Sequence, residues 1–314
     1  LRAGLAIGPV LVQTPRAGYV PHLVCGRCRH PARCDSCGGG LTMPSSGPPL
    51  CGACGTVADH WRCPECAGTG LRAMRVGSMR TAEELGRAFP QTPVIASESG
   101  HGIVASVDAA PRVVVATPGA EPEAEGGYAA VVLLDGALAT SLPGLMGSEE
   151  ALRRWFAAAW LARPASEGGR VVVAGGGTPA VVQALVRWDA VGAAQRELAD
   201  RAELHFPPAA RVVTATGSLD AVTDLVAELE LAPGAEVLGP FPVAPVAGPA
   251  GAPGTVSSVE ADGEEDVVDL SRVLLRSSLA GGAQLSRAVK EALGVRSAHK
   301  RAGRVRVVVD PRDL

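Results

Sequence analysis

Eight cysteines offer the clearest chemistry in this sequence, and all of them lie between Cys25 and Cys66. They form four C-x-x-C pairs, which are Cys25/Cys28, Cys34/Cys37, Cys51/Cys54 and Cys63/Cys66. A secreted disulfide framework joins distant parts of a small fold, so this clustering argues against one. One C-x-x-C pair is also found in redox proteins, but four in succession are typical of the tight turns in which thiolates bind a tetrahedral zinc ion. The pattern therefore predicts zinc binding.

Four pairs supply two zinc sites, each with four thiolate ligands and no open coordination position. In a nested arrangement, the inner pairs form one site and the outer pairs form the other. In a sequential arrangement, the first two pairs bind one ion and the last two bind the other, and the spacing allows both. Catalytic zinc keeps a place for water, so we expect both ions to be structural. His30 and His60 lie nearby in the sequence, but with eight thiols available we expect both to be solvated loop residues.

Charge and hydropathy exclude several classes of function. The 314 residues carry a net charge of -3, so any contact with nucleic acid has to be local. No apolar run is long enough to span a bilayer, and we expect no membrane partner. Unpaired thiols and the lack of a leader lead us to expect a cytoplasmic protein. Because the sequence opens at Leu1 without Met, we expect a fragment of a longer protein.

The cysteine-rich segment interrupts a chain that otherwise alternates between strands and helices. Short β-branched runs that end at Gly, Pro or Asp are typical of buried parallel strands. We expect such strands within 71–77, 93–99, 112–119, 129–136 and 169–174. Helices are predicted over 81–89, with Thr81 and Glu84 in capping-box spacing, and over 148–163, beginning at Ser148. The pattern predicts an α/β layer fold.

The glycine turn after residue 174 has two interpretations. Gly175, Gly177 and Ala180 satisfy the G-x-G-x-x-[GA] dinucleotide pattern between a strand and a helix. However, Pro179 lies inside the expected turn, and no acidic residue ends a following strand about twenty residues later. We therefore expect a plain tight turn. The phosphate-binding sequence G-x-x-x-x-G-K-[ST] does not occur in the chain.

The sequence contains no recognisable catalytic constellation. It has no G-x-S-x-G, no H-E-x-x-H and no cysteine outside the four pairs to serve as a nucleophile. Adjacent carboxylates such as Glu83 and Glu84 point in different directions on a helix. Asp135, at the end of an apolar strand, is the best isolated candidate for an acidic site residue, although capping of the strand end is the commoner role.

A third region begins near Gln195. We expect a helix before Pro207–Pro208, a strand, a helix over 218–230, no regular structure over the Gly/Pro-rich residues 236–255, and then strand, helix and strand. The C-terminal part is locally basic, which suits phosphate contact, with solvated surface charge as the alternative. Its cations are Arg272, Arg276, Arg287, Arg296, Lys300, Arg301, Arg304 and Arg306.

Several landmarks follow one another in a recognisable order. They are Arg16, Gly18 and Tyr19 in R-x-G-Y, the four cysteine pairs, the helix from Thr81 to Pro90, VVLLD ending at Asp135, Leu142–Pro143, Ser148–Glu149, Pro207–Pro208, L-G-P at Leu238 to Pro240, and the terminal VVVDPRDL. This order resembles the primosomal protein N′ (PriA) replication restart helicase family. The resemblance covers essentially the whole chain and is specific mainly through the cysteine array.

The resemblance implies the C-terminal half of such a protein. The implied fold is a RecA-like second helicase lobe, formed by residues 1–22 and 71–194, with a zinc-binding module inserted at 23–70. A small α+β C-terminal domain follows at 195–314. It also implies the nested pairing, with Cys25, Cys28, Cys63 and Cys66 at zinc 1 and Cys34, Cys37, Cys51 and Cys54 at zinc 2. Implied partners are branched or single-stranded DNA at replication forks, primosome proteins and single-stranded DNA-binding protein, in a nucleoid-associated setting.

The chain departs from the family at its helicase motifs. Where the family has a G-T-Q-x-x-x-K-G-H-D-like motif, this chain has ATPGAEPEAEGG, without Lys or His. Where the family has Q-x-x-G-R-A-G-R, this chain has AAWLARPASEGG, and Arg163 alone does not supply the paired guanidiniums that stabilise a transferring phosphate. The Arg/Tyr-rich stretch expected after L-G-P is replaced by the apolar VAPVAGPAGAPG, which weakens the case for DNA contacts there.

The altered motifs resemble a degenerate branch of the family seen in actinobacteria. We therefore expect a protein that binds zinc and DNA without helicase activity. ATP is a cofactor only under the alternative of an active ATP-dependent 3′-5′ DNA helicase. A further alternative is a zinc-dependent protein-interaction module without affinity for DNA.

Overall fold

The computed structural model describes residues 1–15, 23–43, 48–51, 55–73, 78–100, 102–140, 144–243 and 270–312. Cys54, the R-x-G-Y landmark with Arg16, Gly18 and Tyr19, the Leu142–Pro143 pair and most of the apolar stretch 243–254 lie outside these residues. The chain divides into two compact units, Leu1–Ala193 and Ala194–Leu314. Of the helices in the described ranges, none combines the length and the apolarity that crossing a bilayer requires.

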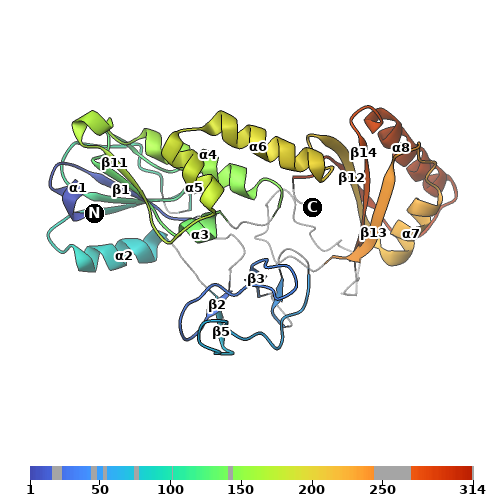
Figure 1. Ribbon diagram of the computed structural model, residues 1–314, viewed down its shortest axis with the longest axis horizontal. Coiled ribbons are helices and arrows are strands. Elements are labelled where there is room, and N and C mark those ends of the chain that lie inside the picture. Colours follow the sequence, from blue (N-terminus) through green and yellow to red (C-terminus); the bar gives the residue numbers. More distant parts are fainter. Residues whose placement is uncertain are drawn as a thin grey trace. The chain divides into compact units, whose positions relative to one another are not determined.

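A parallel five-stranded sheet forms the centre of the first unit (Figure 1). In spatial order its strands are β11 (Arg170–Val173), β10 (Ala130–Leu133), β1 (Val10–Gln13), β8 (Val113–Ala116) and β6 (Val94–Ser97). The central strand β1 pairs in parallel with both β10 and β8. All four residues of β1, β8 and β10 are buried, which explains why these strands are continuous apolar runs. The strands predicted within 93–99, 112–119, 129–136 and 169–174 are confirmed.

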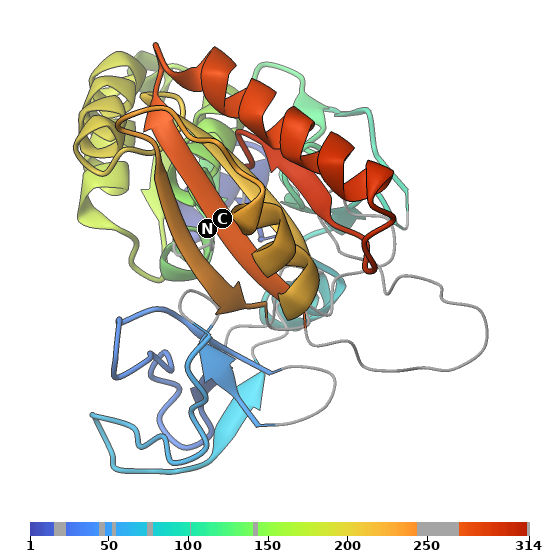
Figure 2. The same ribbon diagram turned by 90° about the vertical axis from the view of Figure 1, so that its right-hand side faces the viewer.

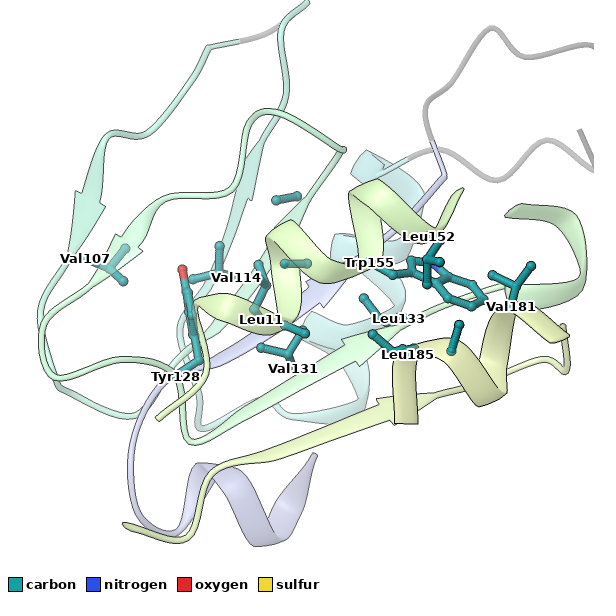
Figure 3. Packing of buried hydrophobic residues seen from close by; sticks show 14 residues of the cluster. Leu11, Val107, Val114, Tyr128, Val131, Leu133, Leu152, Trp155, Val181 and Leu185 are labelled. Carbon is teal, nitrogen blue, oxygen red and sulfur yellow. The ribbon is translucent and has the colours of Figure 1, made fainter. Parts of the chain in front are cut away.

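Helices cover both faces of this sheet. Helices α4 (Gly147–Trp160) and α5 (Pro179–Arg187) bury Trp155, Val181 and Leu185 against alternate residues of the central strands (Figure 3). The strand residues on that face include Leu11, Val114, Val131 and Leu133. The opposite face carries the intervening valines, such as Val12 and Val115, and packs against α2 (Ser78–Ala88). The alternation follows from the two-residue period of a strand.

Smaller elements complete the first unit. They are α1 (Arg2–Leu5), α3 (Gly136–Ala139), a 3-10 turn (Ala165–Glu167), and the parallel pair β7 (Ser106–Val107) and β9 (Glu123–Ala124). Helix α6 (Ala190–Glu203) extends across the boundary into the second unit.

The cysteine-rich segment contains two short antiparallel strand pairs. β2 (Leu23–Cys25) pairs with β5 (Leu71–Ala73), and β3 (Leu41–Thr42) pairs with β4 (Leu50–Cys51). The strand expected within 71–77 therefore begins in the cysteine-rich segment and does not join the parallel sheet.

Three local predictions in the first unit are wrong. Helix α2 begins at Ser78, so Thr81 lies inside its first turn and is not an N-cap. Helix α4 begins at Gly147 after an N-cap at Met146, so Ser148 is an interior residue, and the helix ends at Trp160. Pro179 is the first residue of α5, not part of the turn, with Thr178 as N-cap. Proline suits this position because the first amides of a helix have no intrahelical partner.

The second unit is a four-stranded antiparallel sheet with two helices on one face. Its order is β13 (Glu236–Pro242), β14 (Leu270–Ser278), β12 (Ala210–Ser218) and β15 (Arg306–Val309). Helices α7 (Leu219–Ala227) and α8 (Gly282–Ala298) lie side by side over it (Figure 2). Val213 and Leu275 of the sheet pack there against Val222, Leu285 and Val289.

Strand β13 corrects the expectation that 236–255 has no regular structure. Residues 236–242 pair with β14, although the register shifts between Leu238 and Phe241. Gly239 has a φ of 104°, and Pro240 follows it within this irregular part. The strand is at the edge of the sheet, where a proline without an N–H is tolerated.

Candidate metal centre

The described parts of the four cysteine pairs share one backbone turn. In each, the amide of the first cysteine donates to the carbonyl five residues later, at 2.8–2.9 Å. The amide four residues after the first cysteine donates back to that cysteine's carbonyl, at 2.8–3.0 Å. The residue after the second cysteine has a positive φ in every case: Arg29 (65°), Gly38 (72°), Gly55 (73°) and Ala67 (56°). This repeated turn is the zinc-knuckle geometry that the C-x-x-C spacing predicts.

The short strands bring distant pairs together. Cys25 lies opposite Leu71 in the β2–β5 pairing, and the amide of Gly26 donates to the carbonyl of Gly70 at 2.8 Å. The first knuckle therefore meets the fourth, which ends at Cys66. Cys51 lies opposite Leu41 in the β3–β4 pairing, so the second knuckle meets the third.

The described sulfurs fall into two nested groups. One contains Cys25, Cys28, Cys63 and Cys66, and the other contains Cys34, Cys37 and Cys51. Within each group all ligand atoms lie within 4.8 Å of one another. Cys54, the fourth ligand expected in the second group, lies outside the described residues. The sequential arrangement does not occur among the described thiols.

The spacing of the sulfurs suits a metal ion better than a disulfide. Sγ–Sγ distances are 3.5 Å for Cys25 to Cys66, 3.4 Å for Cys28 to Cys63 and 3.4 Å for Cys37 to Cys51. A disulfide needs about 2.05 Å. A tetrahedron with Zn–S bonds of about 2.3 Å has edges of about 3.8 Å, so small adjustments would accommodate an ion. Both groups can hold a metal ion.

The electrostatics of the first group also favour a cation. Backbone N–H groups of Cys28 and Arg27 lower the pKa of the Cys25 thiol to about 6. The N–H of His30 favours the Cys28 thiolate, but burial and the neighbouring sulfurs raise the pKa of Cys28 to about 12. Four thiolates cannot share this space without a positive ion between them, and binding one releases the remaining protons.

The two histidines of the segment stay outside both groups of sulfurs. His30 Nδ1 lies 4.0 Å from Glu65, and the side chain of His60 is 95% exposed beside Asp59. Neither joins a cluster of ligating atoms in the described residues.

The cysteines also make up much of the segment's core. The buried residues of that core are Leu23, Cys25, Ala32, Cys34, Leu41, Cys51, Trp61 and Cys63. Half of these eight residues are cysteines. Trp61 is oriented by a hydrogen bond of 3.1 Å from its Nε1 to the carbonyl of Arg33.

The carboxyl edge of the parallel sheet carries the other candidate residues. Asp135 follows β10 with a φ of 53° and precedes α3 without a side-chain capping bond. Burial raises the pKa of its carboxyl group above the usual value. Asp135 is thus the N-cap residue of α3 by position, without a capping bond from its side chain.

The glycine turn packs backbone against backbone beside Asp135. The amides of Gly136 and Ala137 donate to the carbonyls of Ala174 and Gly175 at 2.9 and 3.1 Å. A Cβ atom at Gly136 would lie 2.0 Å from the carbonyl oxygen of Gly176. Close packing of two turns explains these glycines without a nucleotide.

Residues 116–127, ATPGAEPEAEGG, occupy the position at which the PriA family has its Lys- and His-containing helicase motif. Hydrogen bonds to neighbouring residues hold this stretch in place. Glu121 accepts hydrogen bonds from the buried Gln13 side chain at 2.6 Å and from the Gly119 amide at 2.7 Å. The buried Tyr128 hydroxyl donates to the carbonyl of Pro122 at 2.9 Å. A carboxylate thus occupies a loop at the carboxyl edge of the sheet, where it would repel a phosphate.

Arg163 lies at the opposite, amino-terminal edge of the sheet. Its guanidinium donates to the carbonyls of Gly126, Gly127 and Ile7 at 3.0–3.1 Å. These residues precede β10 and β1, so the Arg163 side chain links the two segments that lead into these strands. Arg163 has a structural role here.

The basic residues of the C-terminal unit do not form one surface. Arg276 is bound to Glu236 and the carbonyl of Leu204, and Arg272 donates to Thr216. Arg296 is buried and pairs with Asp224. Arg301 lies 3.8 Å from Glu228, whereas Lys300, Arg304 and Arg306 are exposed.

Comparison with known proteins found relatives that match nearly the whole chain. A probable replication restart protein PriA of Mycobacterium tuberculosis (strain H37Rv) is 43% identical over 321 residues, which cover 99% of this chain and 47% of the relative. The protein of the same name from Mycobacterium leprae is 42% identical over 318 residues, covering 99% of this chain and 46% of the relative. The chain is a homologue of these PriA proteins. It spans about half the length of the curated relatives it matches.

A family model places a PriA domain in the second unit. The model for the primosomal protein N C-terminal domain matches residues 202–312. This range begins at the end of α6 and includes the whole four-stranded sheet with α7 and α8. The resemblance expected from the sequence is thereby confirmed.

Proposed function

We propose that this chain acts in replication restart by binding branched or single-stranded DNA at stalled forks, without ATP-driven unwinding. A relative that matches 99% of the chain is named probable replication restart protein PriA. Partners in this role are primosome proteins and single-stranded DNA-binding protein, in a cytoplasmic, nucleoid-associated setting. The single structural observation that carries the proposal is the grouping of the described thiols into two nested sets, which is the arrangement that the resemblance to the PriA family implies.

Each thiol group holds one structural zinc ion in this proposal. Zinc supplies the charge that keeps four thiolates together, and it links two knuckles that are distant in the sequence. The ligands of the first ion are Cys25, Cys28, Cys63 and Cys66. Those of the second are Cys34, Cys37, Cys51 and, by its place in the same knuckle pattern, Cys54.

The domain arrangement proposed is a degenerate RecA-like lobe interrupted by the zinc module and followed by the C-terminal domain. The parallel sheet supports the lobe, since the cysteine-rich segment enters between β1 and β6. Three features support the loss of ATP hydrolysis. Glu121 is held in place of a Lys/His motif, Arg163 is bound at the amino edge, and the glycine turn is filled by packing.

A titration of labelled DNA tests the DNA-binding role. The zinc-loaded protein would be added to forked, single-stranded and duplex DNA at two salt concentrations, and the anisotropy followed. We expect tighter binding to the fork and weaker binding at the higher salt concentration, because phosphate contacts release counterions. Absence of binding to all three DNAs would overturn the DNA role and favour a module that binds protein partners.

The helicase alternative has its own test. DNA-stimulated ATP hydrolysis by the natural protein would contradict the loss of ATP-driven unwinding. We expect its hydrolysis rate to be the same with and without forked DNA.

A further inference from the structure

The turn between α8 and β15 concentrates positive charge. Residues 296–306 read RSAHKRAGRVR, with five Arg or Lys residues and no acidic residue. We propose that this turn forms a phosphate-binding site that takes phosphate groups of the DNA backbone. The inference rests on the proposed function and assigns part of its DNA contact to the C-terminal unit.

A hollow of about 350 Å³ lies at the end of α8. Three of the seven residues that line it are cationic, namely Arg296, Lys300 and Arg301, and none is acidic. The other lining residues are Leu293, Ser297, Gly303 and Val305, so no carboxylate among them opposes an anion.

Arg296 forms the rigid base of the site. Its side chain is 6% exposed, and its guanidinium donates to Asp224 at 3.2 Å and to the carbonyls of Ala302 and Gly303 at 3.0 and 3.2 Å. Among the residues that the structure describes, these contacts use three of the five N–H groups that a guanidinium carries. A preorganised guanidinium with unused N–H groups is well suited to a phosphate.

Lys300 has a backbone conformation that its side chain does not favour. Helix α8 ends in a Schellman arrangement, in which the Lys300 amide donates to the Ser297 carbonyl at 3.1 Å and the Arg301 amide donates to the Arg296 carbonyl at 3.0 Å. Lys300 takes the left-handed position of this arrangement, with a φ of 50°, where glycine is usual. A lysine held there at a conformational cost indicates a use for its ammonium group.

The charges around the hollow leave an excess of positive charge. Asp224 and Glu228 of α7 face Arg296 and Arg301, but the second contact is long, at 3.8 Å. Lys300 has no ion pair among the residues that the structure describes. The carboxyl end of a helix dipole disfavours anions, yet its last carbonyls here already accept backbone amides. The cations therefore dominate the field in the hollow.

Charge-matched double variants test the site. Lys300→Gln/Arg301→Gln removes two cations from the hollow, and Arg287→Gln/Lys290→Gln removes two exposed cations from the outer face of the same helix. DNA affinity would be measured by anisotropy over a series of salt concentrations. The plot of log K against log salt has a negative slope. We expect Lys300→Gln/Arg301→Gln to make this slope less steep by about 1.5 and to weaken binding roughly tenfold, with little change for Arg287→Gln/Lys290→Gln.

Lys300→Gly separates a functional role from a structural one. Glycine suits the left-handed position, so this variant should keep or raise Tm while it weakens DNA binding. Unchanged DNA affinity in Lys300→Gly, whatever its Tm, would overturn the inference, as would an equal fall in slope for both double variants or no fall in either.

Failure of the proposed DNA-binding function and failure of the phosphate site give different experimental results. If the wild-type chain binds no DNA, that function fails, and the site is judged by calorimetric titration with inorganic pyrophosphate. Heat of binding that is lost only in the Lys300→Gln/Arg301→Gln variant would keep a phosphate site that is filled from a free anion. Equal heats in all variants, or none, would overturn the site as well.

Discussion

The cysteine-rich segment and the parallel sheet are held together in different ways. Half of the buried core of the segment is cysteine, and its apolar members are few. The sheet buries continuous valine-rich strands on both faces, against α2 on one side and α4 and α5 on the other. We therefore expect the segment to need bound metal for its stability, whereas hydrophobic burial stabilises the sheet.

The same two regions also differ in how their polar side chains and thiols are arranged. The described thiols of the segment converge on two points. In the sheet, the polar residues at the expected helicase motifs are used for internal contacts, as Glu121 and Arg163 show. The apolar core of the sheet does not involve these two side chains, so its packing does not depend on a helicase site.

Removal of metal should have the largest effect. A strong chelator should unfold the segment, because loss of the ions removes the links between its knuckles and the remaining apolar core is too small. Hydrogen exchange should then become fast in peptides from 23–43 and 55–73 and stay slow in β1, β8 and β10. Retained protection in the segment would show that the metal is not what holds it.

Truncation of a core side chain of the sheet should destabilise the sheet and leave the metal content of the cysteine-rich segment unchanged. Trp155 is 2% exposed between α4 and the sheet, so Trp155→Ala should lower the free energy of unfolding by about 3–5 kcal/mol. Denaturant unfolding measures this, and the metal content should not change. Trp160→Ala is the matched control, since this tryptophan is 76% exposed and its removal should change stability by about 0.5 kcal/mol or less.

Loss of Arg163 should destabilise the sheet without changing binding. Arg163→Met removes three hydrogen bonds to carbonyls and should lower the free energy of unfolding by about 2 kcal/mol. DNA affinity should equal that of the wild type. A variant with wild-type stability but altered nucleotide or DNA binding would contradict the structural role of Arg163.

Substitutions in the knuckle turns should have the smallest effects. They should speed metal release from one thiol group and slow it from the other. Gly38 and Ala67 have the same left-handed conformation, and a Cβ on Gly38 would meet nothing within 4 Å. Gly38→Ala should therefore cost only backbone strain, about 1 kcal/mol, and Ala67→Gly should relieve a similar strain. With a chromophoric chelator, we expect one ion to leave about fivefold faster in the first variant and one to leave more slowly in the second. Equal rates in both would mean that this turn does not control metal release.

The sequence predicts the parts of the fold that depend on local pattern. The valine-rich strands β6, β8, β10 and β11 are read directly from their apolar runs. The helix starts were wrong at Thr81 and Ser148, since each helix begins before the residue with the best capping side chain. Strand β13 was missed because pairing with β14 outweighs the poor strand propensity of its Gly and Pro residues.

The candidate site was predictable in its residues but not in its grouping. Spacing allowed nested and sequential pairs, and the choice depends on the pairing of β2 with β5, which are almost fifty residues apart. The left-handed conformation of Lys300 gave no signal either, because glycine is the usual residue there. The partners of the basic residues, such as Asp224 for Arg296, come from another helix and are visible only in the fold.

We propose that the cysteine-rich segment holds two metal ions in closed four-thiolate sites. Elemental analysis by mass spectrometry of freshly purified protein, with free thiols counted in the same sample, tests it most directly. We expect two zinc ions per chain in the wild type, one after Cys34→Ser/Cys37→Ser, and one after Cys25→Ser/Cys28→Ser. Less than one zinc ion per chain, with the cysteines found as disulfides, would contradict it.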